Sequence, residues 1–151
     1  MILIRKALPE ESEVIASFQT EMAMETEQMM LDPVRVDMGV KAVFSDPSKG
    51  CYYVAEIDGG VKGSLLVTYE WSDWRNSKVV WIQSVYILPG FRKMGIFRRL
   101  YDFIKQMVES GNEYSGIRLY VDRRNIDAIE VYRRCGMDGD HYKMFEWIRD
   151  L

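Results

Sequence analysis

Residues 85–100 (VYILPGFRKMGIFRRL) combine an apolar run, a Pro-Gly pair, two adjacent basic residues and a glycine. The pattern predicts a buried strand and a short loop that leads into an amphipathic helix. A helix N-terminus presents N–H groups without intrahelical partners and a partial positive charge, and both favour an anion. Gly95 lets the backbone approach a diphosphate closely, and Arg92 and Lys93 add positive charge. These residues predict a diphosphate-binding site, with an ordinary basic strand-to-helix turn as the open alternative.

Charge and motif content narrow the class of ligand. Residues 1–50 carry nine acidic and five basic residues, whereas residues 89–134 carry ten basic and six acidic ones. A basic second half favours a phosphate-bearing ligand, while the net charge of −3 gives no sign of a nucleic-acid partner. The chain contains neither GxxxxGK[ST] nor GxGxxG, which excludes the P-loop and the dinucleotide-binding fingerprint.

Cysteine and histidine usage and hydropathy argue against several other classes. The two cysteines, Cys51 and Cys135, lack metal-ligand spacing, and His141 is the single histidine, so we expect no metal site and no Ser-His-Asp triad. No apolar run approaches the roughly 20 residues that span a bilayer. The N-terminus (MILIRKALPEE) turns acidic too early for a signal peptide. We therefore expect a cytoplasmic protein without a membrane partner.

The elements that must position the anion site alternate along the chain. Helix signals occur over 9–22, 33–44, 95–109 and 125–135, and strand patterns over 2–4, 51–57, 61–69, 78–87, 117–121 and 142–148. The nearly continuous apolar run at 78–87 is typical of a central strand, and its polar Gln83 and Ser84 are expected to face a cleft. Without a repeat, low-complexity tract or linker, residues 1–151 are expected to form one mixed domain.

Two motifs in the second half resemble those of the GNAT superfamily of N-acetyltransferases. The first, [RQ]-x-x-G-x-[GA] between a strand and a helix, reads RKMGIF from Arg92 and departs from the pattern at Phe97. The second, N-x-x-A-x-x-x-Y-x-x-x-G-[FM], is matched from Asn125 through Met137, with Tyr132 at its tyrosine position. The likeness covers the order of elements in the whole chain. It is strong over 79–137 and weak over 1–50.

The resemblance implies a fold and a cosubstrate. The fold is a single α+β domain with a central, mostly antiparallel, twisted sheet of about six to seven strands, a splayed central strand and about four flanking helices. The cosubstrate is acetyl-CoA, with no metal. The residues implied to contact coenzyme A are Val85, Tyr86, Ile87, Arg92, Lys93, Met94, Gly95, Ile96, Phe97, Asn125 and Tyr132.

The resemblance also assigns roles within this set. The backbone at Val85 and Ile87 would bind the pantetheine arm much as an added strand would. Residues 92–97 would hold the diphosphate, for which the ring of Phe97 must turn into the core. Asn125 would bond the pantetheine or cap its helix. Tyr132 would protonate the departing thiolate, although its spacing alone also fits a core aromatic.

Acids near aromatic residues are the candidates for the general base and the acceptor site. The candidate acids are Glu25, Glu27, Glu70 and Asp73, each of which, taken singly, fits a solvated surface acid better than a base. The aromatic residues are Tyr69, Trp71, Trp74 and Trp81. Carboxylates and aromatic faces together suit a cationic acceptor through charge pairing and cation–π contact.

The function implied by the resemblance is the transfer of an acetyl group from acetyl-CoA to a primary amine. The acceptor would be a small molecule, a lysine or an N-terminus, and the amine would attack directly in a ternary complex. The late helical position of Cys135 among apolar neighbours favours a structural role over an acyl-enzyme. A non-catalytic acyl-CoA-binding sensor or partner-binding module is the alternative. Exposed sheet edges leave a homodimer open.

Overall fold

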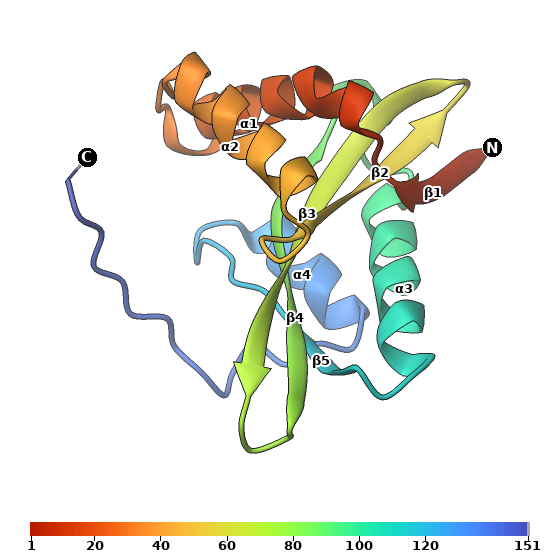
Figure 1. Ribbon diagram of the computed structural model, residues 1–151, viewed down its shortest axis with the longest axis vertical. Coiled ribbons are helices and arrows are strands. Elements are labelled where there is room, and N and C mark those ends of the chain that lie inside the picture. The colour runs from red at the N-terminus through yellow and green to blue at the C-terminus, as the bar shows by residue number, and fades with distance from the viewer. Residues whose placement is uncertain (151) are drawn as a thin grey trace. The chain divides into compact units, whose positions relative to one another are not determined.

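The computed structural model describes residues 1–150. Residues up to Arg118 and those from Leu119 onward form two compact units, and each is described by itself. The first unit is built on one sheet with the strand order β1-β2-β3-β4-β5 (Figure 1). The strands are β1 (Ile2–Lys6), β2 (Cys51–Ile57), β3 (Gly60–Ser72), β4 (Ser77–Ile87) and β5 (Tyr114–Arg118). Neighbouring strands are antiparallel except for the parallel pair of β4 and β5, which confirms the expected mostly antiparallel sheet.

Three α-helices and two short 3-10 turns connect these strands. They are η1 (Pro9–Glu11), α1 (Ser12–Glu27), α2 (Pro33–Ser45), η2 (Pro89–Phe91) and α3 (Ile96–Glu109). Local chemistry explains their ends. Helix α1 stops where Gln28 adopts a left-handed conformation, and the side chain of Asp32 caps α2 by accepting the N–H of Val34.

The helices cover both faces of the sheet. Adjacent residues of a strand point to opposite faces. Tyr52 stacks on Phe44 of α2 with ring centroids 5.7 Å apart, whereas Tyr53 packs on Phe103 of α3 at 5.5 Å. Phe18 of α1 packs on the ring of Tyr86 at 5.3 Å. Helices α1 and α2 therefore lie on one face and α3 on the other.

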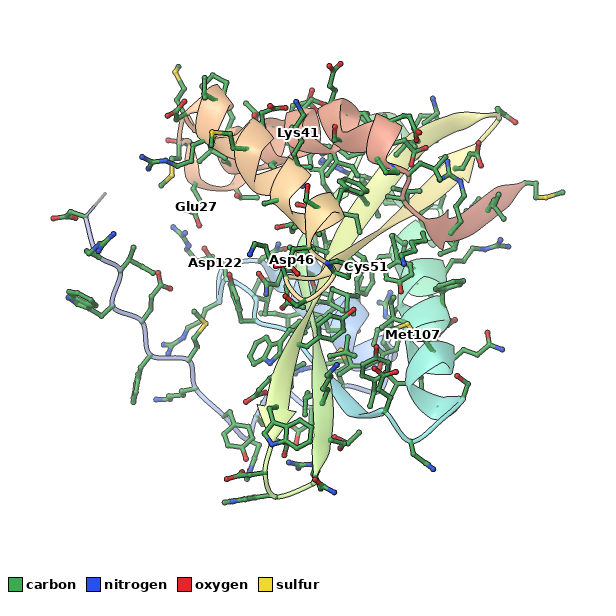
Figure 2. The ribbon with its side chains drawn as sticks, viewed as in Figure 1. Glu27, Lys41, Asp46, Cys51, Met107 and Asp122 are labelled. Carbon is green, nitrogen blue, oxygen red and sulfur yellow. The ribbon has the colours of Figure 1, made fainter. Side chains whose placement is uncertain are left out.

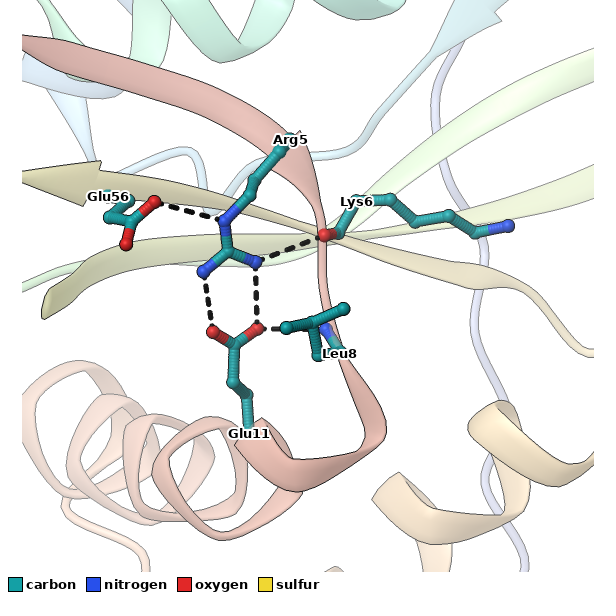
Figure 3. A network of polar contacts seen from close by, with 5 residues as sticks. All are labelled: Arg5, Lys6, Leu8, Glu11 and Glu56. Carbon is teal, nitrogen blue, oxygen red and sulfur yellow. Dashed lines mark hydrogen bonds and ion pairs between the residues drawn. The ribbon is translucent and has the colours of Figure 1, made fainter. Parts of the chain in front are cut away.

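A polar network fixes the first turn of the chain onto the sheet (Figure 3). The guanidinium of Arg5 donates to both carboxylate oxygens of Glu11, at 2.6 and 3.1 Å, and to Glu56 of β2 at 3.1 Å. Glu11 also accepts the backbone N–H of Leu8 at 2.8 Å. The hydrogen bond from Arg5 holds the pKa of Glu11 below its usual range. The network joins β1, β2 and the entry to α1.

The second unit contains one helix, α4 (Ile126–Arg134), among its described residues. The Oδ1 atom of Asn125 accepts the N–H of Ala128 at 3.1 Å, which starts the helix. Gly136, with a φ of 87°, ends it. With α4, the described part of the chain has the four α-helices that were expected.

The predicted strands near the C-terminus need correction. The described residues form five strands, fewer than the six to seven expected. Residues 142–148 carry no regular secondary structure, and Phe145 is 93% exposed, so the alternation seen there did not make a strand. The strand predicted at 117–121 lies at Tyr114–Arg118, because pairing with β4 starts at Tyr114. Apolar patterning gives strand propensity, whereas a partner strand decides where a strand exists.

Candidate active site

Strand β4 contains a bulge beside the predicted pantetheine residues. Ser64 of β3 pairs with Tyr86, but Leu66 pairs with Gln83, so β4 holds one residue more than β3 between these two pairs. Ser84 adopts a φ of 52°, which is unusual for a residue other than glycine. Such a bulge bends its strand and increases the local twist. The strand therefore changes direction just before Val85.

The second half of β4 is open along one edge. Pairing with β5 runs from Lys78–Tyr114 to Trp81–Arg118 and ends there, so residues 82–87 pair within the sheet only with β3. The N–H of Leu88 bonds to Lys62, and the alternation of an antiparallel ladder then turns the N–H and C=O of Ile87 toward the open edge. This is the splayed central strand that was expected, and an extended ligand can add to it.

The loop after β4 has the backbone geometry of an anion cradle. Lys93 and Gly95 both have left-handed conformations, with φ of 63° and 75°, and Gly95 is the N-cap of α3. The first N–H groups of α3, which follow Gly95, have no partners within the helix and are available to an anion. A Cβ at Gly95 would meet no atom within 4 Å, so packing does not require glycine there. Glycine is favoured at position 95 by its left-handed φ and by the space that it leaves for a ligand. Residues 92–95 are exposed, whereas Ile96 is buried.

Phe97, the departure from the family motif, packs on another aromatic residue of α3. Its ring packs against the ring of Tyr101, one turn further along α3, with centroids 6.2 Å apart. Phe97 is half-buried and Tyr101 is buried. The ring of Phe97 therefore packs against the next turn of its own helix. The exposed start of α3, with the left-handed Lys93 and Gly95 before it, could hold an anion such as a diphosphate.

Arg92 is turned toward α1. Its Nε donates to the carbonyl of Ile87 at 2.8 Å, and its Nη2 donates to Glu25 at 2.8 Å. The guanidinium carbon lies 5.3 Å from the ring centre of Tyr86. The hydroxyl of Tyr86 lies within hydrogen-bond distance of Glu21, at 2.9 Å, and of Glu25, at 3.0 Å. Four predicted site residues thus meet in one cluster, namely Glu25, Tyr86, Ile87 and Arg92.

Glu21 joins this cluster although sequence reasoning did not select it. It lies four residues before Glu25, on the same face of α1, and that spacing was the available signal. The pKa of Glu25 is lowered, and the hydrogen bond from Arg92 is the largest cause of this shift. Burial is the largest cause of the raised pKa of Tyr86, followed by its hydrogen bonds to the two carboxylates. Glu25 is therefore ionised and Tyr86 protonated near neutral pH.

The other candidate acids lie in different surroundings. Glu70 accepts the indole N–H of Trp81 at 2.9 Å and the guanidinium of Arg118 at 2.7 Å, and these bonds lower its pKa. Asp73 accepts the N–H of Trp74 at 2.9 Å in the connection from β3 to β4. Figure 2 shows Glu27 at the C-terminal end of α1, where it is exposed. The acids do not form one cluster in the described residues.

The aromatic residues proposed for the acceptor site also lie in different surroundings. Trp71 and Trp74 are 61% and 89% exposed near the turn of the long β3–β4 ribbon seen in Figure 1. Tyr69 stacks on Tyr114, with centroids 5.9 Å apart. Trp81 is half-buried and bonded to Glu70. Tyr69 and Trp81 therefore contribute to packing between strands.

The predicted residues of the second unit are described within that unit. Asn125 uses its Oδ1 as the cap of α4, as one of its two expected roles required. Tyr132 is half-buried, and burial raises the pKa of its phenol. The proton it would donate is therefore retained at neutral pH. Cys135 is buried at the end of α4, which agrees with a structural role.

Residues 1–150 contain neither a cluster of metal ligands nor a membrane-spanning helix. No group of three or more His, Cys, Asp or Glu residues in this range could hold a metal ion. No helix within it is long and apolar enough to cross a bilayer.

Comparisons with known proteins identify the family of the chain. Residues 13–137 match the family model described as the acetyltransferase (GNAT) family. A crystal structure titled as a possible acetyltransferase from Clostridium difficile 630 is 38% identical with a TM-score of 0.91, and the match covers 100% of this chain and 99% of that one. No curated protein sequence matched significantly.

More distant structures share the fold. Ribosomal-protein-alanine N-acetyltransferase from Brucella melitensis biovar Abortus 2308 is 15% identical with a TM-score of 0.79, covering 99% of this chain and 100% of that one. Glucosamine-6-phosphate N-acetyltransferase from Arabidopsis thaliana is 17% identical with a TM-score of 0.73, covering 99% of each chain. Their acceptors differ in kind, so the shared fold does not identify an acceptor.

Proposed function

Because this chain belongs to the GNAT family of acetyltransferases, we propose that it transfers an acetyl group from acetyl-CoA to a primary amine. The observation that supports this best is the continuity of β4 with the loop that follows. A bulged strand with an open edge leads directly into the left-handed Lys93 and Gly95 and the start of α3. A diphosphate bound at that start would be followed by an extended arm along β4.

The chemistry needs positioning more than activation. An acetyl thioester is already reactive, so the chain must hold it beside the amine and stabilise the charge that develops on the carbonyl oxygen. A backbone N–H at the bulge near Val85 is our candidate for the second task. We assign to Tyr132, on the family motif, the proton that the departing thiolate takes up. The amine attacks the carbonyl carbon directly.

The choice of general base follows from hydrogen bonding. Glu25 and Glu70 each accept a hydrogen bond from an arginine, and their pKa values are lowered, so both are weak proton acceptors. In the part of the chain that the structure describes, neither Glu27 nor Asp73 accepts a hydrogen bond from an arginine, and of these two only Glu27 lies on α1 beside the Glu25 cluster. We therefore propose Glu27 as the base. The acids of α1 as a group favour a cationic acceptor.

The test measures binding and turnover separately. Calorimetric titration with coenzyme A measures the Kd, and release of free thiol from acetyl-CoA measures turnover with diamines, lysine peptides and peptides with free N-termini. Lys93→Glu tests the binding site itself. Because Lys93 is exposed, reversing its charge should raise the Kd for coenzyme A more than tenfold without lowering the Tm. Tight binding without turnover of any amine would support a non-catalytic module instead. Lack of binding would refute both.

A further inference from the structure

The side chain of Arg92 connects the cofactor loop to the first helix of the chain. It leaves the loop, passes the ring of Tyr86 and ends at Glu25 of α1, 67 residues away in the sequence. On the way its Nε donates to the carbonyl of Ile87, the last residue of β4. Both of these hydrogen bonds are internal to the protein. Arg92 is therefore already engaged before any phosphate arrives.

Glu25 is itself held on a buried support. One of its oxygens accepts from Arg92 and the other lies 3.0 Å from the hydroxyl of Tyr86. Tyr86 is 4% exposed, and its ring packs on Phe18 in the core. The carboxylate is thus anchored through Tyr86 to β4, and through its own backbone to α1. A carboxylate fixed at both oxygens restricts the guanidinium that it binds.

The loop needs such a support. Lys93 is a residue other than glycine in a left-handed conformation, which costs free energy unless the neighbours impose it. Residues 92–95 are exposed, so packing against the core does not impose it. The hydrogen bond from Arg92 to the carbonyl of Ile87 restrains the backbone immediately before Lys93. Glu25 binds the same guanidinium through another nitrogen. The conformation of the cradle thereby depends on α1.

We propose that Glu25 is a positioning residue for the cofactor cradle, which acts by holding Arg92 across the ring of Tyr86. The proposal rests on the proposed function, since it concerns the affinity for coenzyme A. It assigns Arg92 to the support of the loop and leaves the contact with phosphate to Lys93 and the start of α3. It also makes α1, which carries the acids proposed for the acceptor, part of the cofactor site.

A double-mutant cycle tests whether Glu25 acts through Arg92. The ion pair is about 40% exposed, with side-chain values of 40% for Glu25 and 42% for Arg92, so its loss should raise the Kd for coenzyme A by about two- to fivefold. Glu25→Ala and Arg92→Ala should each do so, and the double variant should be no worse than either single one. Glu25→Gln, which retains an oxygen acceptor, should recover part of the loss. Glu13→Ala, an exposed acid on the same helix, is the control and should bind like the wild type.

A second measurement needs neither coenzyme A nor activity. Trypsin must take an arginine side chain into its binding pocket, and Glu25 restrains the side chain of Arg92 in its exposed loop. In Glu25→Ala, cleavage after Arg92 should be at least threefold faster than in the wild type and in Glu13→Ala, at equal Tm. Equal cleavage rates, or additive effects in the cycle, would overturn the proposal. Loss of kcat at unchanged Kd and cleavage rate would overturn it too, in favour of Glu25 as the base.

Discussion

Replacing Gly95 by alanine should change both the stability of the protein and its affinity for coenzyme A, and the two effects can be measured separately. Gly95 has a φ of 75°, in the left-handed region, and a Cβ there would meet no atom within 4 Å. The stability cost should therefore be the left-handed penalty alone, about 1–2 kcal/mol. For a chain of this size that corresponds to a fall in Tm of roughly 2–8 °C.

The effect on coenzyme A should be larger than strain can explain. Gly95 is the N-cap of α3, so a methyl group would stand where a phosphate must approach the first N–H groups. Loss of one hydrogen bond to a charged group costs about 1.5–3 kcal/mol, which predicts a rise in Kd of roughly 10- to 100-fold. Calorimetric titration with coenzyme A measures it.

Gly59 offers a matched control. It has a φ of 79° in the turn between β2 and β3, and a Cβ there would also meet no atom within 4 Å. Gly59→Ala should therefore lower the Tm as much as Gly95→Ala and leave the Kd within about twofold, since the strain is the same. If the two variants bind coenzyme A equally well, the cradle is not where the diphosphate binds, and the reasoning fails.

Three further predictions concern catalysis and stability. Tyr132→Phe should lower kcat at least tenfold while changing the Kd for coenzyme A less than threefold, because it removes a proton donor; stopped-flow thiol release and calorimetry measure these, and equal losses would indicate packing. Glu27→Gln should lower kcat by about 100-fold and remove the acidic limb of the pH profile of kcat/KM, and an unchanged profile would exclude Glu27 as the base. Glu11→Gln should lower stability by about 1–2 kcal/mol at pH 7. Because Arg5 lowers the pKa of Glu11 in the folded state, that contribution is present above the ordinary glutamate pKa and is lost as the pH falls through the lowered value. Thermal unfolding of both proteins from pH 7 to pH 3 should therefore show the difference in Tm shrinking, and a constant difference would contradict the assignment.

Local signals were sufficient for the elements around the cradle. The Pro-Gly pair after an apolar run and the periodicity from Gly95 placed the end of β4 and the start of α3, because backbone restrictions and helix ends depend on neighbouring residues. The contact of Phe97 with Tyr101 agrees with helix spacing, although the expectation for Phe97 was only that its ring turns into the core. The family motif added the identity of the ligand, which the geometry alone would leave as an anion.

Features that depend on pairing between strands were not predictable. The bulge at Ser84 exists because Ser64 and Leu66 of β3 pair with residues three apart in β4, and no signal within β4 shows that register. Glu70 was proposed as a base from its sequence neighbours, yet Arg118 reaches it only because β5 lies parallel to β4. The alternation at 142–148 predicted a strand, but a pattern cannot supply a partner.

The structure of β4 explains why one strand can serve both the cofactor and α1. Side chains of a strand project from its faces, whereas its N–H and C=O groups lie along its edges. The open edge at Ile87 leaves the main-chain N–H of that residue to a ligand, while the side chain of Tyr86, one residue earlier, reaches Glu21 and Glu25 on the helix. Arg92 uses both directions, since it bonds the carbonyl of Ile87 at the edge and crosses the ring of Tyr86 toward α1. A change on α1 can therefore alter cofactor affinity without touching the cofactor, whereas a change on the β3–β4 turn should not.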